Sequence, residues 1–472
     1  MRRFPFPALA GLCVAAGLIS GSCAGGGKPR PNVILLVFDT CRADRLSAFG
    51  HPRPTTPRLE ALAARGVRYR RAYTPAPWTA PAHASLFSGV AMCRHGLEVG
   101  RGDRVHPGIP LLAETLRGAG YDTAGFSANA YVSALTGLSR GFRWFETVFD
   151  PATGAHDADR ALKSVRAWLE VRNPDPAKEG PFFVFVNFMD THLPLSPPRS
   201  DVEAVRDPAV LDEELRSASA VGQPEALSHL MGVRRLDEGT LRGLRARYDG
   251  AARFLDRTAG EVLDLLERRG FLKDALVVVT ADHGENLGEH GQLDHRLSMY
   301  DTLLRVPLVV HRPGRYEGGA VVDAEVSLMD VYATILAEAG VPVPGGAGVD
   351  ARPLPTKGGE GRPLLAEFAN MRAHYEELRS GLPGVEESVF EPMLWDIASA
   401  RDPLSRPGAR KYLRWTRRDA GGPERVIKEE LYDPRDDPGE ERNLLASGDP
   451  GARAEAERLA AEIVRMRAEG MR

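Results

Sequence analysis

From Pro31 onward, short apolar runs alternate along the chain with longer stretches whose apolar residues recur at helical spacing. Three runs are almost continuously apolar, as strands buried on both faces are. They cover residues 32–38, 181–187 and 275–280. The clearest helical stretch covers residues 241–269, and Gly270 is a residue type that ends helices. This alternation predicts an α/β fold with a mainly parallel central sheet flanked by helices on both faces.

The pattern changes after about residue 339. Residues 342–348 are rich in proline and glycine, which is typical of a boundary between folded parts. We therefore expect a main domain over residues 31–340 and a smaller C-terminal α+β subdomain over residues 341–472. Residues 199–238 are charged and poor in strand pattern, which predicts a surface excursion, and the sequence assigns this excursion no role.

The first residues have the pattern of an export signal. Arg2 and Arg3 precede an apolar run over residues 8–19, which is too short to span a bilayer as a helix. Small residues precede Cys23, and this ending resembles the lipobox of bacterial lipoproteins, which implies cleavage before Cys23 and acylation of its thiol. We predict a signal peptide over residues 1–22 and a lipidated Cys23 with a flexible tether over residues 23–30. An ordinary cleaved signal with an incidental Cys23 is the alternative.

These features predict an exported protein, a periplasmic or cell-envelope lipoprotein whose anchor binds the membrane. The composition is that of an ordinary globular protein, with 43% hydrophobic and 26% charged residues among 472. Its 61 Lys and Arg against 64 Asp and Glu leave no net positive field, so we expect no nucleic-acid partner. Beyond the signal, the remaining cysteines are Cys41 and Cys93. They could form a disulfide or be two free thiols, and the sequence does not decide between these alternatives.

Polar clusters directly follow the three apolar runs. They are Asp39-Thr40, Asp190-Thr191-His192 and Asp282-His283. Ligand sites in open α/β sheets collect at the carboxyl ends of strands, so these clusters can converge on one crevice. Carboxylates with an imidazole suit Ca²⁺, Mg²⁺, Mn²⁺ or Zn²⁺. The alternative for each single Asp is an ordinary helix cap or turn.

A further candidate lies at a predicted helix start. Thr79 occupies the expected cap position and Pro81 the first turn. A capped helix is one interpretation. The other is a nucleophile, because a hydroxyl beside a divalent cation has a lowered pKa, and helix N–H groups can hold an anionic ester.

Taken together, the order of these motifs resembles the sulfatase family, within the alkaline phosphatase superfamily. The resemblance covers nearly all of the chain after the signal. The matching segments are residues 39–44, 55–59, 66–69, 79–89, 94–96, 190–194, 282–291, 305–308 and 431–434.

The resemblance implies a sulfatase-like catalytic domain over residues 31–340 that hydrolyses sulfate or phosphate esters with one divalent ion, Ca²⁺, Mg²⁺ or Mn²⁺. It implies that Thr79 is the nucleophile and that His192 and His290 are further catalytic candidates. The implied metal ligands are Asp39, Thr79, Asp282 and His283. The implied substrate-binding residues are His83, Asn129, His192 and His295.

Several positions depart from the family pattern. Most sulfatases carry a Cys or Ser that is converted to formylglycine, whereas this chain has Thr79, so we expect no formylglycine. His83 replaces the Arg that follows the nucleophile, and Thr40 replaces a second Asp. The stretch 125–130, which contains Asn129, lacks the family's Lys-x-His, and Leu297 stands where a Lys is expected. Fewer fixed positive charges therefore remain for a sulfate.

A threonine beside one divalent ion is similar to lipoteichoic acid synthases and to nucleotide pyrophosphatase-phosphodiesterases of the same superfamily. We therefore expect a sulfated or phosphorylated small molecule, glycan or lipid as substrate. One alternative is a phosphodiesterase or phosphoglycerol-type transferase acting on envelope lipids or glycans. Another is a non-catalytic member of the family that binds anionic glycans.

Overall fold

In the computed structural model of the protein, residues Pro31–Arg472 pack together as one unit. The predicted signal peptide, Cys23 and the tether up to residue 29 lie outside the described residues. None of the helices in the described part of the chain combines the length and apolar character that crossing a membrane requires. The structure describes residues 30–470 except 99–102, 150–155, 174–177, 179, 317, 345–349, 370–371, 373–374, 381, 383 and 420–421.

An eight-stranded sheet with the strand order β12-β2-β11-β7-β1-β6-β4-β5 forms the centre of this unit. The five strands from β7 to β5 run parallel, whereas β11 is antiparallel to both of its neighbours. The mainly parallel sheet expected from the sequence is therefore confirmed. In sheet order, the strands are Ala320–Val322, Val67–Tyr69, Leu308–His311, Leu276–Ala281, Val33–Phe38, Phe182–Phe188, Asp122–Ser127 and Trp144–Thr147.

β1 lies in the middle of the sheet because its six residues are all apolar. Every one of them is buried, which fits a parallel strand covered on both faces. β6 and β7, which flank β1, are buried along their whole lengths as well. The three apolar runs recognised in the sequence are thus three adjacent strands, β6-β1-β7.

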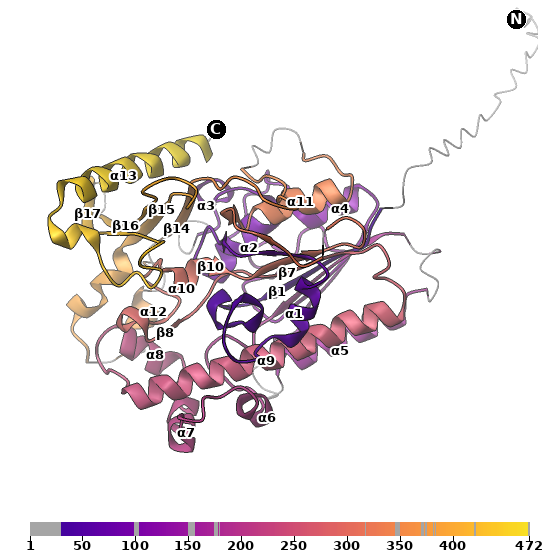
Figure 1. The fold of residues 1–472 in the computed structure, drawn as a ribbon, viewed down its shortest axis with the longest axis horizontal. Coiled ribbons are helices and arrows are strands. Elements are labelled where there is room, and N and C mark those ends of the chain that lie inside the picture. The colour runs from indigo at the N-terminus through magenta and orange to yellow at the C-terminus, as the bar shows by residue number, and fades with distance from the viewer. Residues whose placement is uncertain are drawn as a thin grey trace, which may run out of the picture. The chain divides into compact units, whose positions relative to one another are not determined.

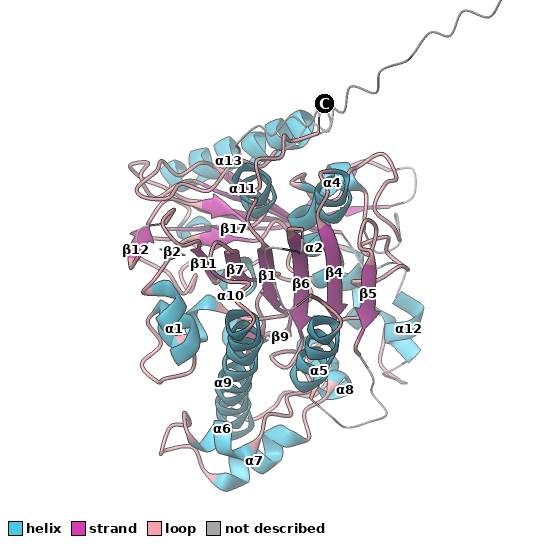
Figure 2. Cartoon of the chain, turned by 90° about the vertical axis from the view of Figure 1, so that its right-hand side faces the viewer, coloured by secondary structure: helices cyan, strands magenta, loops and turns pink. Residues whose placement is uncertain are grey.

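Helices cover both faces of the sheet (Figure 2). On one face lie α1 (Pro57–Ala63), α5 (Asp157–Glu170) and α9 (Glu238–Arg268), and on the other lie α2 (Thr79–Ser88), α4 (Leu112–Gly118) and α11 (Asp330–Glu338). The Asp237 side chain caps α9 by accepting a hydrogen bond from the Thr240 N–H. α9 ends at Arg268, and Gly270 follows at a positive φ of 72°, so the predicted helix stop is confirmed.

A second sheet occupies the C-terminal part of the chain (Figure 1). It is antiparallel, in the order β14 (Leu364–Phe368), β15 (Asp396–Arg401), β16 (Lys411–Arg418) and β17 (Glu424–Tyr432). The long helix α13 (Pro450–Gly470) packs on it through Ala456, Leu459 and Ile463. The expected smaller α+β part is therefore present, while its boundary at residue 340 stays a prediction.

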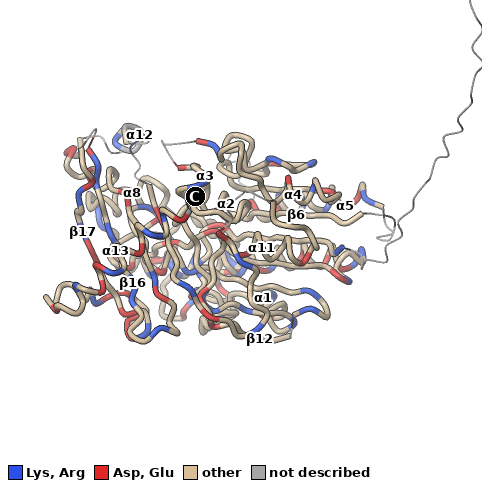
Figure 3. The backbone as a smooth tube through the Cα atoms, turned by 90° about the horizontal axis from the view of Figure 1, so that it is seen from above, with Lys and Arg blue, Asp and Glu red and all other residues tan. Residues whose placement is uncertain are grey.

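The C-terminal sheet is fixed to the rest of the unit by apolar and charged contacts. Tyr300 and Leu304 belong to the same apolar cluster as Leu413 and Trp415 of β16. The fully buried Lys411 forms ion pairs with Glu440 and with Asp301 of α10 (Asp301–Leu304). Basic and acidic residues are interspersed along the chain here and elsewhere (Figure 3).

The charged segment 199–238 forms three helices, which are α6 (Arg199–Glu203), α7 (Asp212–Ser219) and α8 (Gln223–Leu230). Of these, α6 and α7 contact α9, and α7 and α8 contribute to a small apolar cluster with α9 residues. Cys41 and Cys93 are both free thiols, which decides between the two alternatives that the sequence left open.

Candidate active site

The strand register brings two predicted ligands together at one edge of the sheet. Phe38, the last residue of β1, pairs with Phe188 of β6 on one side and with Ala281 of β7 on the other. Asp39 directly follows β1 and Asp282 directly follows β7, so both carboxylates lie at the same edge of the sheet. The Thr40 N–H donates to Asp282 Oδ1 at 3.1 Å, which ties the two strand ends to each other.

The predicted nucleophile lies at the beginning of α2. Trp78 is the N-cap and Thr79 is the first helical residue, so the expected cap position of Thr79 is wrong by one residue. All ten residues of α2 are buried. Small side chains at Ala80 and Ala84 let the helix pack closely into the main core, which fixes the position of the Thr79 hydroxyl.

Asp39, Asp282 and His283 form a cluster whose ligand atoms all lie within 4.8 Å of one another. Asp39 Oδ1 and Asp282 Oδ2 are buried and accept no hydrogen bond from the residues that the structure describes. His283 Nε2 lies 3.4 Å from Asp282 Oδ2 and 3.4 Å from Thr79 Oγ1. Two unsatisfied carboxylate oxygens beside an imidazole nitrogen and a hydroxyl are the donor set of a divalent cation, so these residues fit the predicted metal site.

Two asparagines orient this cluster. Asn129 Nδ2 donates to Asp39 Oδ2 at 2.9 Å and to Thr79 Oγ1 at 3.2 Å, and Asn187 Nδ2 donates to Asp39 Oδ2 at 3.2 Å. Asn129 follows β4 and was expected to bind substrate, whereas the structure shows it joining a ligand to the nucleophile. Asn187 was missed. Its place in the sequence could have marked it, because it is the one amide side chain in the otherwise apolar strand β6.

Burial controls the protonation of the cluster. It raises the pKa of Asp39 to about 6, and the neighbouring Asp282 charge contributes in the same direction. Burial also raises the pKa of Asp282 to about 7, opposed by hydrogen bonds from the backbone of His283 and Thr40. For His283, burial lowers the pKa to about 3, so its imidazole is neutral and able to bind a metal.

His83 lies beneath the nucleophile. Its side chain is fully buried, with Nδ1 3.0 Å from the Thr79 carbonyl oxygen and 3.4 Å from Asp282 Oδ2. Its ring also packs edge-on against Phe87 and Phe185. Burial lowers the pKa of His83 to about 3, so a neutral imidazole stands where the family pattern has an Arg.

Two further histidines adjoin the cluster. The ring centroid of His295 lies 4.7 Å from that of His283 and 5.2 Å from that of His192. His192 is brought there by its neighbour Thr191, which donates to the Asp39 carbonyl oxygen at 2.6 Å. Burial lowers the pKa of both His192 and His295. These two predicted residues therefore join the metal ligands at one place.

Asp190 and His290 have other partners. The Asp190 carboxylate accepts the Ala158 N–H at the start of α5, as a helix cap does. The His290 ring stacks on Tyr300 at a centroid distance of 3.7 Å, beside the C-terminal sheet. The structure thus does not bring His290 into the cluster that holds Thr79.

Thr40 adopts a strained conformation next to the cluster. Its φ of 55° is unusual for a β-branched residue, and such positions cost of the order of 1–3 kcal/mol. Tyr248 of α9 stabilises this conformation, because its hydroxyl donates to the Thr40 carbonyl at 2.6 Å and accepts the Arg42 N–H at 2.8 Å. Tyr248 lies within the helix predicted over residues 241–269, and the sequence gives its hydroxyl no role.

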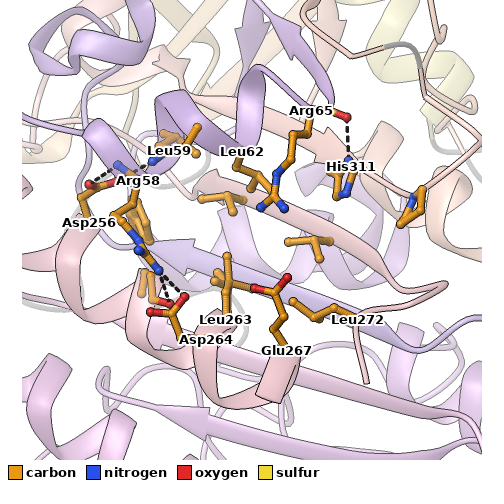
Figure 4. A pocket seen from close by; sticks show the side chains of 18 of the residues that line it. Arg58, Leu59, Leu62, Arg65, Asp256, Leu263, Asp264, Glu267, Leu272 and His311 are labelled. Carbon is orange, nitrogen blue, oxygen red and sulfur yellow. Dashed lines mark hydrogen bonds and ion pairs between the residues drawn. The ribbon is translucent and has the colours of Figure 1, made fainter. Parts of the chain in front are cut away.

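A separate pocket of about 570 Å³ lies between α1, α9 and the sheet (Figure 4). Part of its charged lining is paired: Arg58 forms an ion pair with Asp264, and the Asp256 carboxylate accepts the Arg58 and Leu59 N–H groups. None of the residues predicted for the site lines this pocket. It belongs to the packing of α1 and α9 against the sheet.

Comparison with known proteins identifies the family of the chain. The sulfatase family profile matches residues 31–341, well over half of the chain. An arylsulfatase of Clostridium perfringens is 24% identical over 374 residues, covering 67% of this chain and 76% of the relative. A choline-sulfatase of Rhizobium meliloti is 26% identical over 388 residues, covering 72% of this chain and 74% of the relative.

Among solved structures, the phosphonate monoester hydrolase of Agrobacterium radiobacter has the same fold. It superposes with a TM-score of 0.69 at 21% identity and covers 93% of this chain and 96% of its own. The profile match and the relatives agree with the family resemblance found in the sequence. The chain therefore belongs to the sulfatase family of the alkaline phosphatase superfamily, and it is a sulfate or phosphate ester hydrolase.

Proposed function

We propose that this hydrolase cleaves a monoanionic sulfate ester or phosphodiester with Thr79 as its nucleophile and one divalent cation bound by Asp39, Asp282 and His283. The observation that carries the proposal is the position of Thr79 Oγ1. It receives a hydrogen bond from the same Asn129 amide that holds Asp39, and it lies 3.4 Å from His283 Nε2. The ligand set and the nucleophile thus meet at a single point.

When bound, the cation lowers the pKa of the Thr79 hydroxyl and neutralises charge that develops on the ester. Asn129 orients the oxygen by donating to it, which leaves a lone pair of Oγ1 for attack. The first turn of α2 leaves the Thr79 and Ala80 N–H groups without helical partners, so they can hold an oxygen of the ester. His192 and His295 are placed to protonate the leaving oxygen, because a bound anion raises the pKa of a neighbouring imidazole.

The charge of the site supports a monoanionic substrate. Among the described residues, no Lys or Arg forms a hydrogen bond or ion pair with Asp39, Thr79, Asp282 or His283. The two carboxylates already balance one divalent cation, so a dianionic phosphate monoester would bring uncompensated charge into a buried site. A sulfate ester and a phosphodiester carry one negative charge each. The names of the sulfatase relatives support sulfated small molecules as one substrate class.

In the same proposal the enzyme is exported and held at the membrane by an acylated Cys23. The support is the sequence of residues 1–30, with its basic start, short apolar run and small residues before the cysteine.

The test is the turnover of matched nitrophenyl sulfate, phosphate monoester and phosphodiester by the full chain carrying Cys23→Ser, loaded with Mn²⁺, Mg²⁺ or Ca²⁺. We expect turnover of a monoanionic ester to exceed that of the monoester dianion. Thr79→Ala should lower kcat at least a thousandfold, because the attacking atom is removed, while the thermal midpoint stays near that of the wild type. Thr136→Ala, a matched change outside the cluster, should keep full activity.

Other outcomes are equally informative. Undiminished turnover by Thr79→Ala would remove Thr79 from the mechanism. A preference for the dianion would contradict the charge argument. Absence of turnover in the metal-loaded wild type would favour the non-catalytic, glycan-binding alternative, and product passed to an added alcohol instead of water would favour the transferase.

A further inference from the structure

A second group of buried ligand-type side chains lies beside the active site. Glu285, Asp294 and His295 place their ligand atoms within 4.8 Å of one another. Glu285 directly precedes β8 (Asn286–Leu287), Asp294 ends β9 (Leu293–Asp294), and the two strands pair as a hairpin. The group therefore sits at the base of this hairpin, and it shares no residue with the cluster of Asp39, Asp282 and His283.

One carboxylate oxygen of this group has no partner among the described residues. Glu285 and Asp294 are both completely buried, and Arg296 forms an ion pair with Asp294. Glu285 Oε1 contacts His295 Nδ1 at 3.2 Å, whereas Glu285 Oε2 is buried and has no hydrogen-bond partner in the described part of the chain. A carboxylate oxygen removed from water in this way needs a cation or a donor.

We propose that Glu285, Asp294 and His295 bind a second divalent ion, of the Mn²⁺ or Zn²⁺ class, at the base of the β8–β9 hairpin.

The distances support a shared ion. His295 Nδ1 lies 3.0 Å from Asp294 Oδ1 and 3.2 Å from Glu285 Oε1. Two ligands that each bind one ion at about 2.1 Å are themselves about 3.0–3.4 Å apart in octahedral or tetrahedral geometry. One imidazole with two carboxylates suits Mn²⁺ or Zn²⁺, whereas Ca²⁺ and Mg²⁺ prefer ligand sets made of oxygen.

An ion at this position would do two things for the enzyme. It would join the two ends of the β8–β9 hairpin through Glu285 and Asp294, which have 8 residues between them in the chain. It would also fix the His295 ring, whose centroid is 4.7 Å from that of His283, and so hold the edge of the active site in one arrangement. With His295 bound to this ion, protonation of the leaving oxygen in the proposed reaction falls to His192, whereas the number of bound ions is measured without turnover.

The test is metal stoichiometry. The full chain carrying Cys23→Ser is stripped with a chelator, reloaded with Mn²⁺ or Zn²⁺, freed of excess metal and measured by elemental analysis, with calorimetric titration of the stripped protein in parallel. We expect two ions per chain in the otherwise unchanged protein and one in Glu285→Gln. Glu289→Gln is the matched control, because Glu289 lies in the same hairpin but pairs with Arg42, and it should keep two ions.

Asp282→Asn is the complementary variant, because it changes a ligand of the active-site ion and none of the second ion. It should lose the active-site ion and keep the second, which leaves one ion per chain. One ion in the unchanged protein and none in Asp282→Asn would overturn the proposal, and so would two ions in Glu285→Gln. If Glu285→Gln does not fold, the comparison of the unchanged protein with Asp282→Asn still decides. None of these ion counts depends on turnover. A failure of the proposed reaction can therefore be distinguished from a failure of the second metal site.

Discussion

At the residue scale, the protonation of Asp39 and Asp282 links metal binding to pH. Burial raises the pKa of Asp39 to about 6 and that of Asp282 to about 7. Without metal, burial makes the protonated carboxyls the favoured form in the folded state. The folding stability that comes from binding these protons is therefore lost as the pH rises through the two pKa values. A metal ion needs both carboxylates ionised, so it gains affinity over the same interval.

We predict that the affinity of the active site for Mn²⁺ falls about a thousandfold between pH 8 and pH 5, because about two protons must leave before the ion binds at the lower pH. Calorimetric titration of the chelator-stripped protein measures this directly. Glu285→Gln is the suitable background, because it removes the second proposed ion from the titration. An affinity that stays constant over this interval would show that the two carboxylates are ionised throughout.

Several site residues could be predicted because each stood out from its sequence surroundings. Asp39, Asp282 and His283 are polar residues directly after apolar runs, and Thr79 begins a helix. Their supporting residues could not be predicted. Tyr248 is one more apolar position of a helix by sequence, and only tertiary packing brings its hydroxyl to the Thr40 carbonyl, 208 residues away along the chain.

At the element scale, the segment after β7 reaches the active site through a close backbone approach. A Cβ added at Gly284 would lie 1.9 Å from the carbonyl oxygen of Thr302 in α10. Gly284 also accepts a hydrogen bond from His283 Nδ1 at 2.9 Å and donates its own N–H to the Leu303 carbonyl at 2.8 Å. The absence of a side chain here lets α10 press against the segment that carries His283.

We predict that Gly284→Ala lowers the free energy of unfolding by about 2 kcal/mol or more, because the backbone of α10 must move away from the strand end. Gly118→Ala is the control, since its added Cβ meets no heavy atom within 4 Å, and in helix α4 it should raise stability by about 0.5–1 kcal/mol. Denaturant unfolding followed by circular dichroism measures both. Equal stability of the two variants would mean that α10 is free to shift.

The long elements of the fold could be predicted, and the short ones could not. The apolar runs and the repeating pattern of α9 carry a strong local signal. β2, β12 and β5 contain three or four residues each, and their pairing partners along the sheet, not their own composition, make them strands. The three helices of segment 199–238 were missed for a related reason, because two of them span only eight residues and one spans five.

At the scale of the whole molecule, a buried charged group ties the C-terminal sheet to α10. Lys411 of β16 is completely buried and pairs with Asp301 of α10 and with Glu440. Arg401 of β15 forms an ion pair with the same Asp301. Removing one partner of a buried pair leaves an uncompensated charge, which typically costs about 3–5 kcal/mol.

We predict one thermal unfolding transition for the protein, because residues Pro31–Arg472 form a single compact unit. Lys411→Met should lower the free energy of unfolding by about 3–5 kcal/mol. The transition should move to a lower temperature and remain a single one. Lys163→Met is the control, because Lys163 is exposed on α5 and its loss should change the free energy of unfolding by about 0.5 kcal/mol or less. Two separate calorimetric transitions would contradict a single unit.

The central position of β1 has a further consequence during synthesis. Its two partner strands begin about 150 and 240 residues later in the chain, at Phe182 and Leu276. At about 5–20 residues per second, a ribosome needs roughly 10–50 seconds to pass from Asp39 to His283. Throughout that time the most apolar strand of the nascent chain has been made but has no complete sheet to join. Any delay in translation or transport therefore lengthens the interval in which this strand is open to aggregation.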